Sequence, residues 1–377
     1  MRDNGKINQK RGLLGDAIAI FGLYSLSVAR PLFEVLAPNA EFFVFKRASR
    51  LEIFIFIFAL SFIIPALLVL IRFLLSKISE KAGNIFQSIV IAILTFAFVV
   101  PGLNSHHFIT NTWMFVLLIL FSGLLGLGYF RLNWLRLFYV YLAPAIVVVP
   151  LLFLFSPRIH RILFESLPDI PSVKVQSETP LVFVIFDEFP LISLLDQNRE
   201  IDPRYPTFLR MSKEWNWYRG ASTVAELTES AVPGILTGRY PGPGRLPVIM
   251  DYPQNLFTLL KNSHHLETFE SISWLNPGHI LVNEDEGYRS RWRSLFSDLW
   301  IVYLHIVLPE KYWFNLPPVQ LSWGNFAAHS GKKRTNRSSY TQDPMMLLKD
   351  FLDVVQRSNK PPVYFLHVML PHCPWHL

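Results

Sequence analysis

Three long stretches of this sequence contain no Asp, Glu, Lys or Arg, and they decide what its first half can fold into. They cover residues 53–71, 84–130 and 137–157. Uncharged apolar runs of about 20 residues match the hydrocarbon core of a bilayer. A buried helix in a large soluble protein is the alternative, but three such runs in tandem disfavour it. The sequence therefore predicts a transmembrane helical domain over residues 1–157.

We expect about five membrane spans, near residues 14–37, 51–75, 84–103, 112–130 and 135–156. The first is the least regular, because Asp16, Arg30 and Glu34 interrupt it and Pro31 would kink it. A re-entrant or interfacial segment is the alternative for this stretch. No cleavable signal peptide is apparent, since the first apolar run lacks a small-residue cleavage site and more spans follow it.

Charged residues in the connecting segments bear on the topology. With five spans and the N-terminus inside, nine basic residues fall on the cytoplasmic side and five on the other, which obeys the positive-inside rule. A four-span topology with the N-terminus inside gives the same count. Charge alone therefore leaves the side of the C-terminal domain open.

The net charge of +7 does not indicate nucleic-acid binding. Part of the excess lies in short loops beside the spans, where it orients the protein and meets anionic lipid head groups. The basic cluster Lys332–Arg334 lies in a polar stretch that resembles a solvated surface loop, with phosphate or head-group contact as the alternative. The single cysteine, Cys373, excludes an internal disulfide framework and a cysteine-based zinc site.

The second half has a different character. Residues 158–180 contain three prolines and mixed charges, which is typical of a linker leaving the membrane surface. Over residues 181–377, short apolar runs alternate with helix-like stretches, which predicts an α/β domain with a mostly parallel sheet. We expect strands over 181–186, 266–272 and 363–369, and helices over 206–215, 231–236 and 256–261.

The strand-like run 181–186 ends in Asp187 and Glu188. Ligands of parallel α/β sheets bind outside the carboxyl ends of the strands, and carboxylate oxygens suit divalent metals. Asp187 is therefore a candidate metal ligand, and Glu188 is a weaker one. The structural alternative is that Asp187 caps the following turn and Glu188 is solvated.

A hydroxyl residue, Thr228, begins the second notable segment, Thr228–Pro241, 41 residues after Asp187. A threonine hydroxyl is a poor nucleophile unless metal coordination or a base activates it. A helix that follows it would direct free backbone N–H groups at an anionic substrate, and Pro233 suits an early position of that helix. The alternative is that Thr228, Thr223 or Ser230 merely caps the helix.

Three segments together resemble the alkaline phosphatase and sulfatase superfamily. They are Val182–Glu188, Thr228–Pro241 and Phe365–Trp375. The closer resemblance is to the membrane-anchored branch that includes lipoteichoic acid synthases and phosphoethanolamine transferases. It implies about five spans before an extracytoplasmic α/β domain, in a bacterial inner or plasma membrane. It also implies a phosphoester substrate among envelope phospholipids or glycans.

The resemblance assigns roles residue by residue. It makes Asp187 a ligand of a divalent metal (zinc, manganese, magnesium or calcium), with Glu188 as a second carboxylate. The family nucleophile lies nine residues before the Thr of a Thr-Gly pair, which here gives Thr228, also a metal ligand. His372, in Pro371–Pro374, matches a histidine that contacts the anionic group of the substrate. His367, in the preceding apolar run, is expected to be structural.

Two departures from the family pattern narrow the chemistry. Sulfatases need Cys or Ser at the nucleophile position and Arg four residues later, where this chain has Thr228 and Val232. Thr cannot form the same aldehyde, so phosphoryl transfer or phosphoester hydrolysis is favoured over sulfate-ester cleavage. Arg239, after the Thr-Gly pair, is expected to support the turn.

The third departure concerns the metal site. Family members complete it with an Asp-His or Asp-Asn pair well downstream of the Pro-His-x-Pro segment, and here only Leu377 follows His376. A site for such metals requires about four to six ligands. We therefore expect a C-terminally truncated sequence. The alternative function is that of a truncated, non-catalytic membrane protein without a full metal site.

Overall fold

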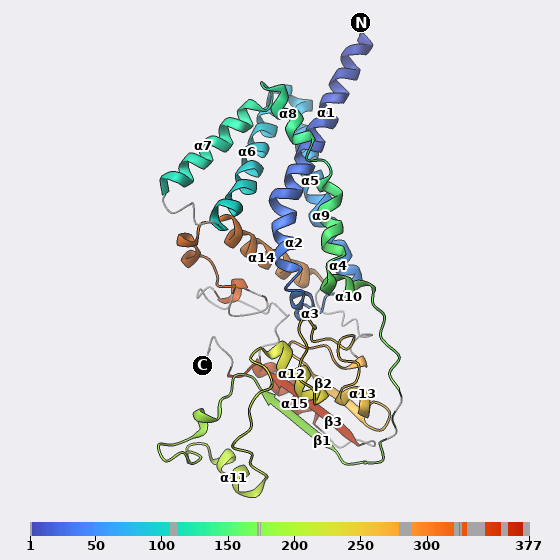
Figure 1. The fold of residues 1–377 in the computed structure, drawn as a ribbon, viewed down its shortest axis with the longest axis vertical. Coiled ribbons are helices and arrows are strands. Elements are labelled where there is room, and N and C mark those ends of the chain that lie inside the picture. The colour runs from blue at the N-terminus through green and yellow to red at the C-terminus, as the bar shows by residue number, and fades with distance from the viewer. Residues whose placement is uncertain are drawn as a thin grey trace. The chain divides into compact units, whose positions relative to one another are not determined.

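The computed structural model describes residues 2–105, 112–171, 173, 175–278, 288–319, 324, 326–329, 344–355 and 361–371. The described chain divides into two compact units (Figure 1). The first consists of Met1–Glu165 and Trp292–Asn336, and the second of Ser166–Arg291 and Arg337–Leu377. The segment from Trp292, expected within the α/β domain, thus packs with the N-terminal helices.

The first unit is helical. Its elements are α1 (Arg2–Tyr24), η1 (Ser25–Ala29), α2 (Arg30–Leu36), α3 (Glu41–Phe45), α4 (Arg50–Phe58), η2 (Ala59–Ile63), α5 (Ile64–Ile78), α6 (Glu80–Ser105), α7 (Thr112–Gly128), α8 (Asn133–Val140), α9 (Ala145–Leu154), α10 (Pro157–Phe164), α14 (Tyr288–Val307), η5 (Glu310–Asn315) and η6 (Phe326–His329). Helix α10 forms where the linker was expected to begin, because Ile159, Ile162 and Leu163 are buried along one side of it.

Four helical stretches among the described residues are long and apolar enough to cross a membrane. They are Leu13–Leu36, Arg50–Ile78, Glu80–Asn104 and Asn133–Leu154. The remaining expected span, near residues 112–130, corresponds to the shorter apolar helix Trp113–Gly128. The first expected span is a continuous helical stretch, so its charged residues do not interrupt the helix.

Prolines in two of these stretches follow short π-helical segments. Segment η1 ends just before Arg30–Pro31, and η2 ends just before Ile64–Pro65. The N–H of Arg30 bonds to the Ser25 carbonyl, five residues back. A proline has no N–H and its ring crowds the preceding turn, so the wider π turn accommodates it without ending the helix.

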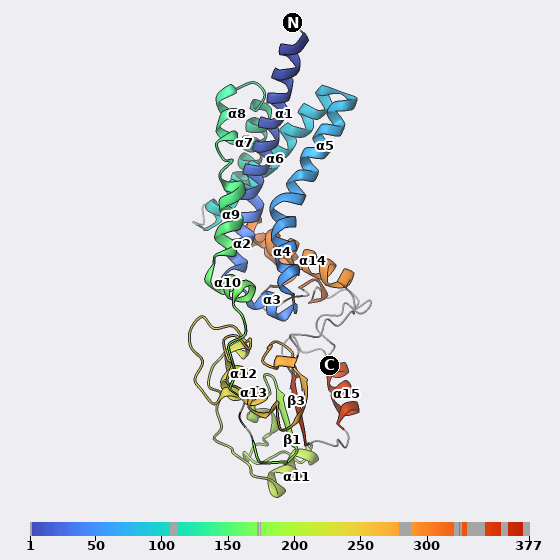
Figure 2. The same cartoon turned by 90° about the vertical axis from the view of Figure 1, so that its right-hand side faces the viewer.

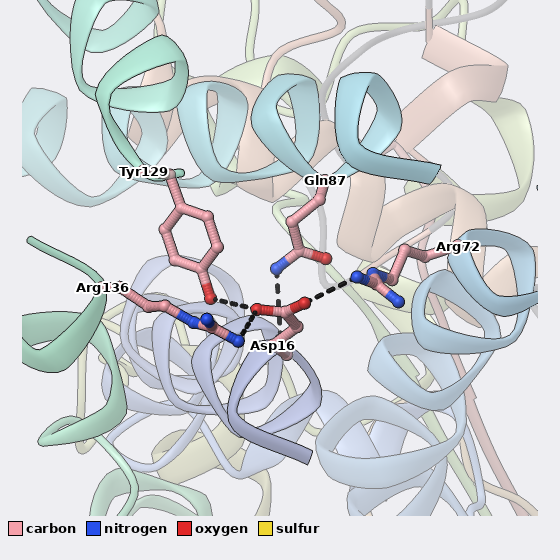
Figure 3. Close-up of polar contacts among 5 residues, drawn as sticks. All are labelled: Asp16, Arg72, Gln87, Tyr129 and Arg136. Carbon is pink, nitrogen blue, oxygen red and sulfur yellow. Dashed lines mark hydrogen bonds and ion pairs between the residues drawn. The ribbon is translucent and has the colours of Figure 1, made fainter. Parts of the chain in front are cut away.

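A buried polar cluster around Asp16 of α1 joins α5, α6, α8 and the turn that follows α7 (Figure 3). The Asp16 carboxylate is 2.6 Å from Arg72 Nη2 and 2.9 Å from Arg136 Nη2, and it accepts a hydrogen bond of 2.9 Å from Tyr129 Oη. Gln87 Nε2 donates to the Asp16 carbonyl. Asp16, only 2% exposed, is thus accommodated inside an apolar unit by pairing.

The second unit contains a three-stranded, fully parallel sheet of strand order β1–β3–β2 (Figure 1). Its elements are β1 (Leu181–Phe186), η3 (Leu191–Leu194), α11 (Pro206–Glu214), α12 (Thr228–Thr237), α13 (Leu256–Leu260), β2 (His265–Phe269), α15 (Pro344–Val354) and β3 (Pro362–Val368). The predicted strands are confirmed to within a few residues, and so is the parallel arrangement.

Both faces of the central strand β3 are covered. On one face, Phe365 packs in a core with Val232 and Leu236 of α12 and with Phe257 of α13. On the other, Leu366 packs in a core with residues of α15 that include Phe351. Alternate residues of a strand point to opposite faces, so the fully buried pattern of β3 follows from helices on both sides.

The segment after β2 is folded around a buried carboxylate. Glu270, 1% exposed, accepts hydrogen bonds from Ser273 Oγ and from the backbone N–H groups of Leu275 and Asn276. Asn276 Nδ2 in turn donates to Thr268 Oγ1 at 2.8 Å. This loop therefore has a structural role in connecting β2 to the rest of the unit.

Candidate active site

Asp187 lies at the carboxyl end of β1, where the sheet holds its backbone. Its N–H donates to the carbonyl of Val368 at 3.0 Å, which extends the β1–β3 ladder by one residue. The register pairs Ile185 with His367. Since Ile185 and Phe365 both pack in the core beneath α12, the alternation of strand side chains places Asp187 and His367 on that same face.

Thr228 is the first residue of α12, and it reaches Asp187. Its Oγ1 lies 3.3 Å from Asp187 Oδ1 and 3.4 Å from Oδ2, so the hydroxyl donates to the carboxylate across 41 residues of sequence. Helix α12 is held in place because Val232 and Leu236, one turn apart, are buried in the core against the sheet. Tyr252 lies in the same core, and burial raises the pKa of its phenol.

Thr228 is not the N-cap residue of α12, so the capping alternative does not apply to it. The N-cap position of α12 is Leu227, which has no capping side chain, and the first helical bonds are accepted by its carbonyl. Thr223, a second alternative, donates to the carbonyl of Ala225 within its own loop. Pro233 is inside α12 rather than in its first turn, so the expectation for this proline was wrong.

The Thr-Gly pair, Thr237 and Gly238, ends helix α12. Thr237 Oγ1 donates to the Pro233 carbonyl at 2.7 Å. Gly238 has φ +65°, the left-handed conformation that glycine adopts without steric cost, and it terminates the helix. Arg239 Nη2 donates to Gln254 Oε1 at 3.0 Å. The pair therefore fixes the length of α12 and the chain direction beyond it.

His367, which was expected to be structural, lies beside Asp187. Its side chain is completely buried in β3, and its Nε2 is 3.9 Å from Asp187 Oδ2. The signal in the sequence is a single imidazole in an otherwise apolar strand, one residue before the strand ends at Val368.

Of the two other candidate site residues, the structure describes Glu188 but not His372. Glu188 is exposed, in the turn after β1, and its φ of +52° places a non-glycine residue in the left-handed region. His372 lies outside the described residues. Among the residues described, no group of three or more His, Cys, Asp or Glu side chains is placed to hold a metal ion.

Asp187 and Thr228 supply two oxygen atoms at a separation compatible with a shared cation. Two ligands fall short of the four to six, roughly, that a divalent metal requires. The described residues therefore do not form a complete metal site. What they do form is a hydroxyl held against a carboxylate at the carboxyl edge of a parallel sheet, beside the beginning of a helix.

No family model matches this sequence, and no curated protein or solved structure matches it.

Proposed function

We propose that this chain is a multi-pass membrane protein whose second unit acts on phosphoester groups, with Thr228 as the nucleophile. The observation that carries the proposal is the hydrogen bond from Thr228 Oγ1 to the Asp187 carboxylate. The resemblance to the alkaline phosphatase and sulfatase superfamily supports it. Both residues occupy the edge of the sheet where α/β enzymes bind their ligands.

The protein groups have complementary roles in this reaction. Asp187 accepts the hydrogen bond of the Thr228 hydroxyl, orients its oxygen and takes its proton as the oxygen attacks phosphorus. The bond from phosphorus to the ester oxygen breaks in the same step, and the leaving alcohol takes up a proton. The first turn of α12 favours a negatively charged group near Thr228. His367, on the adjacent strand, lies against Asp187 Oδ2 and helps to hold the carboxylate in position.

Threonine at this position selects the chemistry. A phosphothreonine ester forms directly from the Thr228 hydroxyl, whereas the sulfatase aldehyde requires oxidation of Cys or Ser. Val232, where sulfatases have Arg, is 2% exposed and packs in the core beneath α12. Phosphoester hydrolysis or phosphoryl transfer therefore fits these residues better than sulfate-ester cleavage.

A divalent metal belongs to this proposal through the resemblance, with Asp187 and Thr228 as ligands. When bound, such an ion would lower the pKa of the hydroxyl and neutralise charge on the phosphoryl group. Because the described residues provide only these two oxygens, the roles given above use protein groups alone. Glu188 and His372 remain candidates for further ligand and substrate contacts.

The proposed substrates are envelope lipids or glycans with phosphorylated head groups. The four apolar helical stretches support an integral membrane location. The resemblance supports an extracytoplasmic position for the second unit in a bacterial plasma or inner membrane. Nucleic acid is not among the proposed partners.

Site variants of the full-length protein in detergent test the proposal. Hydrolysis of p-nitrophenyl phosphate and release of head groups from phosphatidylethanolamine vesicles would be measured with added Mn²⁺, Zn²⁺ or Mg²⁺. Thr228→Ala is expected to lower turnover by about 10³-fold or more. Thr223→Ala is the matched control, because the hydrogen bonds of that hydroxyl to described residues are to Ala225, in its own loop. Asp187→Asn is expected to reduce metal content by elemental analysis.

The alternative is a non-catalytic membrane protein. It would be favoured if the purified protein binds none of these metals and turns over neither substrate. Equal activity of the Thr228→Ala and Thr223→Ala proteins would refute Thr228 as the nucleophile even if activity is present.

A further inference from the structure

Within the first unit, a buried ion pair joins helix α14 (Tyr288–Val307) to Lys46, at the end of α3. Lys46 Nζ is 2.5 Å from Asp298 Oδ2 and donates to Ser294 Oγ at 2.7 Å. Lys46 is 3% exposed and Asp298 is 1% exposed. An unpaired charge of either kind would be costly in this environment, so the pair specifies where α14 packs.

A second contact lies farther along α14. Tyr303 Oη donates to the carbonyl of Ser27 at 3.1 Å. Ser27 precedes Leu36, the end of the first apolar stretch, by nine residues, which corresponds to roughly 13 Å along a helix axis. Figures 1 and 2 both show α14 beside the lower part of the helical bundle. Its C-terminal part therefore reaches well inside the length of the apolar stretch.

The opposite face of α14 is aromatic and exposed. Phe296 is 41% exposed and Trp300 is 60% exposed, one turn apart, whereas Leu295 and Leu299 beside them are buried. Arg293, also exposed, precedes this aromatic face by one turn. Between Ser294 and Pro309 the only Asp, Glu, Lys or Arg is Asp298, which is paired.

Exposed aromatic residues are also present in η5, directly after α14. Phe314 is 83% exposed and Trp313 is 37% exposed. Tyr312 in the same turn packs against Phe115 of the apolar helix α7, with ring centroids 6.0 Å apart. The exposed aromatic residues therefore adjoin a helix whose own surface is apolar.

Large aromatic side chains grouped on a surface mark an interaction site. Trp in particular favours the membrane interface, where its ring is in an apolar region and its N–H is hydrated. A basic residue at the start of such a helix and aromatic residues along it are typical of helices that lie in the plane of a membrane.

We propose that the outer face of α14 and η5, formed by Phe296, Trp300, Trp313 and Phe314, is embedded in the lipid of one leaflet. Arg293 is at the level of the lipid phosphates. The segment enters the bilayer from one side and does not cross it. The proposal rests on the membrane location of the first unit and is independent of Thr228 chemistry.

Site-directed spin labelling in vesicles of phosphatidylethanolamine and phosphatidylglycerol tests this surface. The single native cysteine is removed by Cys373→Ser, and labels are placed by Trp300→Cys or Phe314→Cys. The surroundings of each label are measured by its collision rates with two reagents. Oxygen concentrates in lipid, so frequent collisions with it indicate lipid; a nickel chelate is water-soluble, so frequent collisions with it indicate water. Ile93→Cys, 60% exposed on an apolar helix, is the lipid control, and Tyr218→Cys, 79% exposed in the second unit, is the water control.

We expect the labels at 300 and 314 to resemble the label at 93, with oxygen collisions several-fold above those at 218 and weak collisions with the nickel chelate. Labels at 300 and 314 that resemble the label at 218, while 93 remains in lipid, would overturn the proposal. If 93 itself contacts the chelate freely, the membrane location fails, and the proposal fails with it. Both labelled positions lie on the exposed face, so neither label should disturb folding. Folding is checked by size-exclusion chromatography, in which each labelled protein should elute as a single peak at the position of the Cys373→Ser protein.

Discussion

Replacing Asp16 with Ala should strongly destabilise the helical unit. Three side chains converge on this carboxylate, from α5, from α8 and from the turn after α7, namely Arg72, Arg136 and Tyr129. The substitution removes the only acidic group that the described structure pairs with the buried Arg72. The resulting uncompensated charge, rather than lost packing, is the expected cause of instability.

The expected loss of unfolding free energy follows from how exposed each partner of Asp16 is. Arg72 has a side chain 6% exposed, and breaking a buried ion pair costs about 3–5 kcal/mol. Arg136 is 34% exposed and can be solvated, so it adds little. Polar contacts between helices in membranes are often weaker, about 0.6–1.7 kcal/mol. We therefore expect Asp16→Ala to lower the free energy of unfolding by about 3 kcal/mol.

Unfolding in mixed micelles of dodecyl maltoside and increasing dodecyl sulfate, followed by circular dichroism, measures this change. Glu34→Gln is the matched control, because Glu34 pairs with Arg30 at 2.7 Å while both side chains are more than half exposed. Exposed pairs contribute about 0–1 kcal/mol. The control should thus unfold almost as the parent protein does.

A double-substitution cycle separates the ion pair from other effects. The protein with both Asp16→Asn and Arg72→Gln should be less destabilised than the two single changes added together, by at least about 1 kcal/mol. Additive effects, or an Asp16→Ala protein as stable as Glu34→Gln, would refute the reasoning that a buried charge pair holds these helices together.

Two further predictions concern packing and pH. Gly126→Ala should destabilise the α6–α7 pair by about 1–3 kcal/mol, because an added Cβ would lie 2.4 Å from the Ser88 carbonyl oxygen. Gly123→Ala is the control: an added Cβ there meets open space, so this protein should unfold as the parent does in the same assay. Hydrogen bonds from the Arg204 guanidinium and N–H lower the pKa of Asp202, so its contribution to stability is present above the ordinary Asp pKa and is lost as pH falls through the lowered value. Arg204→Gln should reduce this acid-side loss in unfolding curves recorded across the carboxylate titration range, and an unchanged pH dependence would contradict it.

The sheet could be predicted from the sequence because its strands are short, continuous apolar runs. Leu181–Phe186 matches the structure at both ends, and the other two strands were shifted by a few residues. The start of α12 was missed by three residues. Its N-cap is Leu227, which carries none of the usual capping signals, so nothing local marks the first turn.

The packing of α14 with the N-terminal helices had no local signal either. Its partner Lys46 is 252 residues from Asp298, and each charge alone is typical of a solvated residue. Similarly, Asp16 reads as a break in an apolar run until Arg72 and Arg136 are brought beside it by the helix connections. Such pairings depend on the tertiary arrangement, which periodicity and composition do not encode.

The candidate site was predictable only in part. The strand-end carboxylate and the hydroxyl of Thr228 followed from residue types and motif order, and the structure brings them within hydrogen-bond distance. The position of His367 beside Asp187 depends on the β1–β3 register, which requires knowing that these strands are adjacent. His372 lies outside the described residues, so its expected substrate contact stays a prediction.

The most direct test of the central claim is detection of a phosphoryl group on Thr228. The full-length protein would be incubated with p-nitrophenyl phosphate or phosphatidylethanolamine and Mn²⁺, quenched in acid, digested and examined by mass spectrometry. We predict a modified Thr228 in the parent and Thr223→Ala proteins and no modification at this position in Thr228→Ala. The modification should be a phosphate monoester when p-nitrophenyl phosphate is the donor and a phosphoethanolamine ester when phosphatidylethanolamine is the donor. Turnover without modification at Thr228, or a phosphoryl group that persists elsewhere in the Thr228→Ala protein at the parent level, would contradict the proposal.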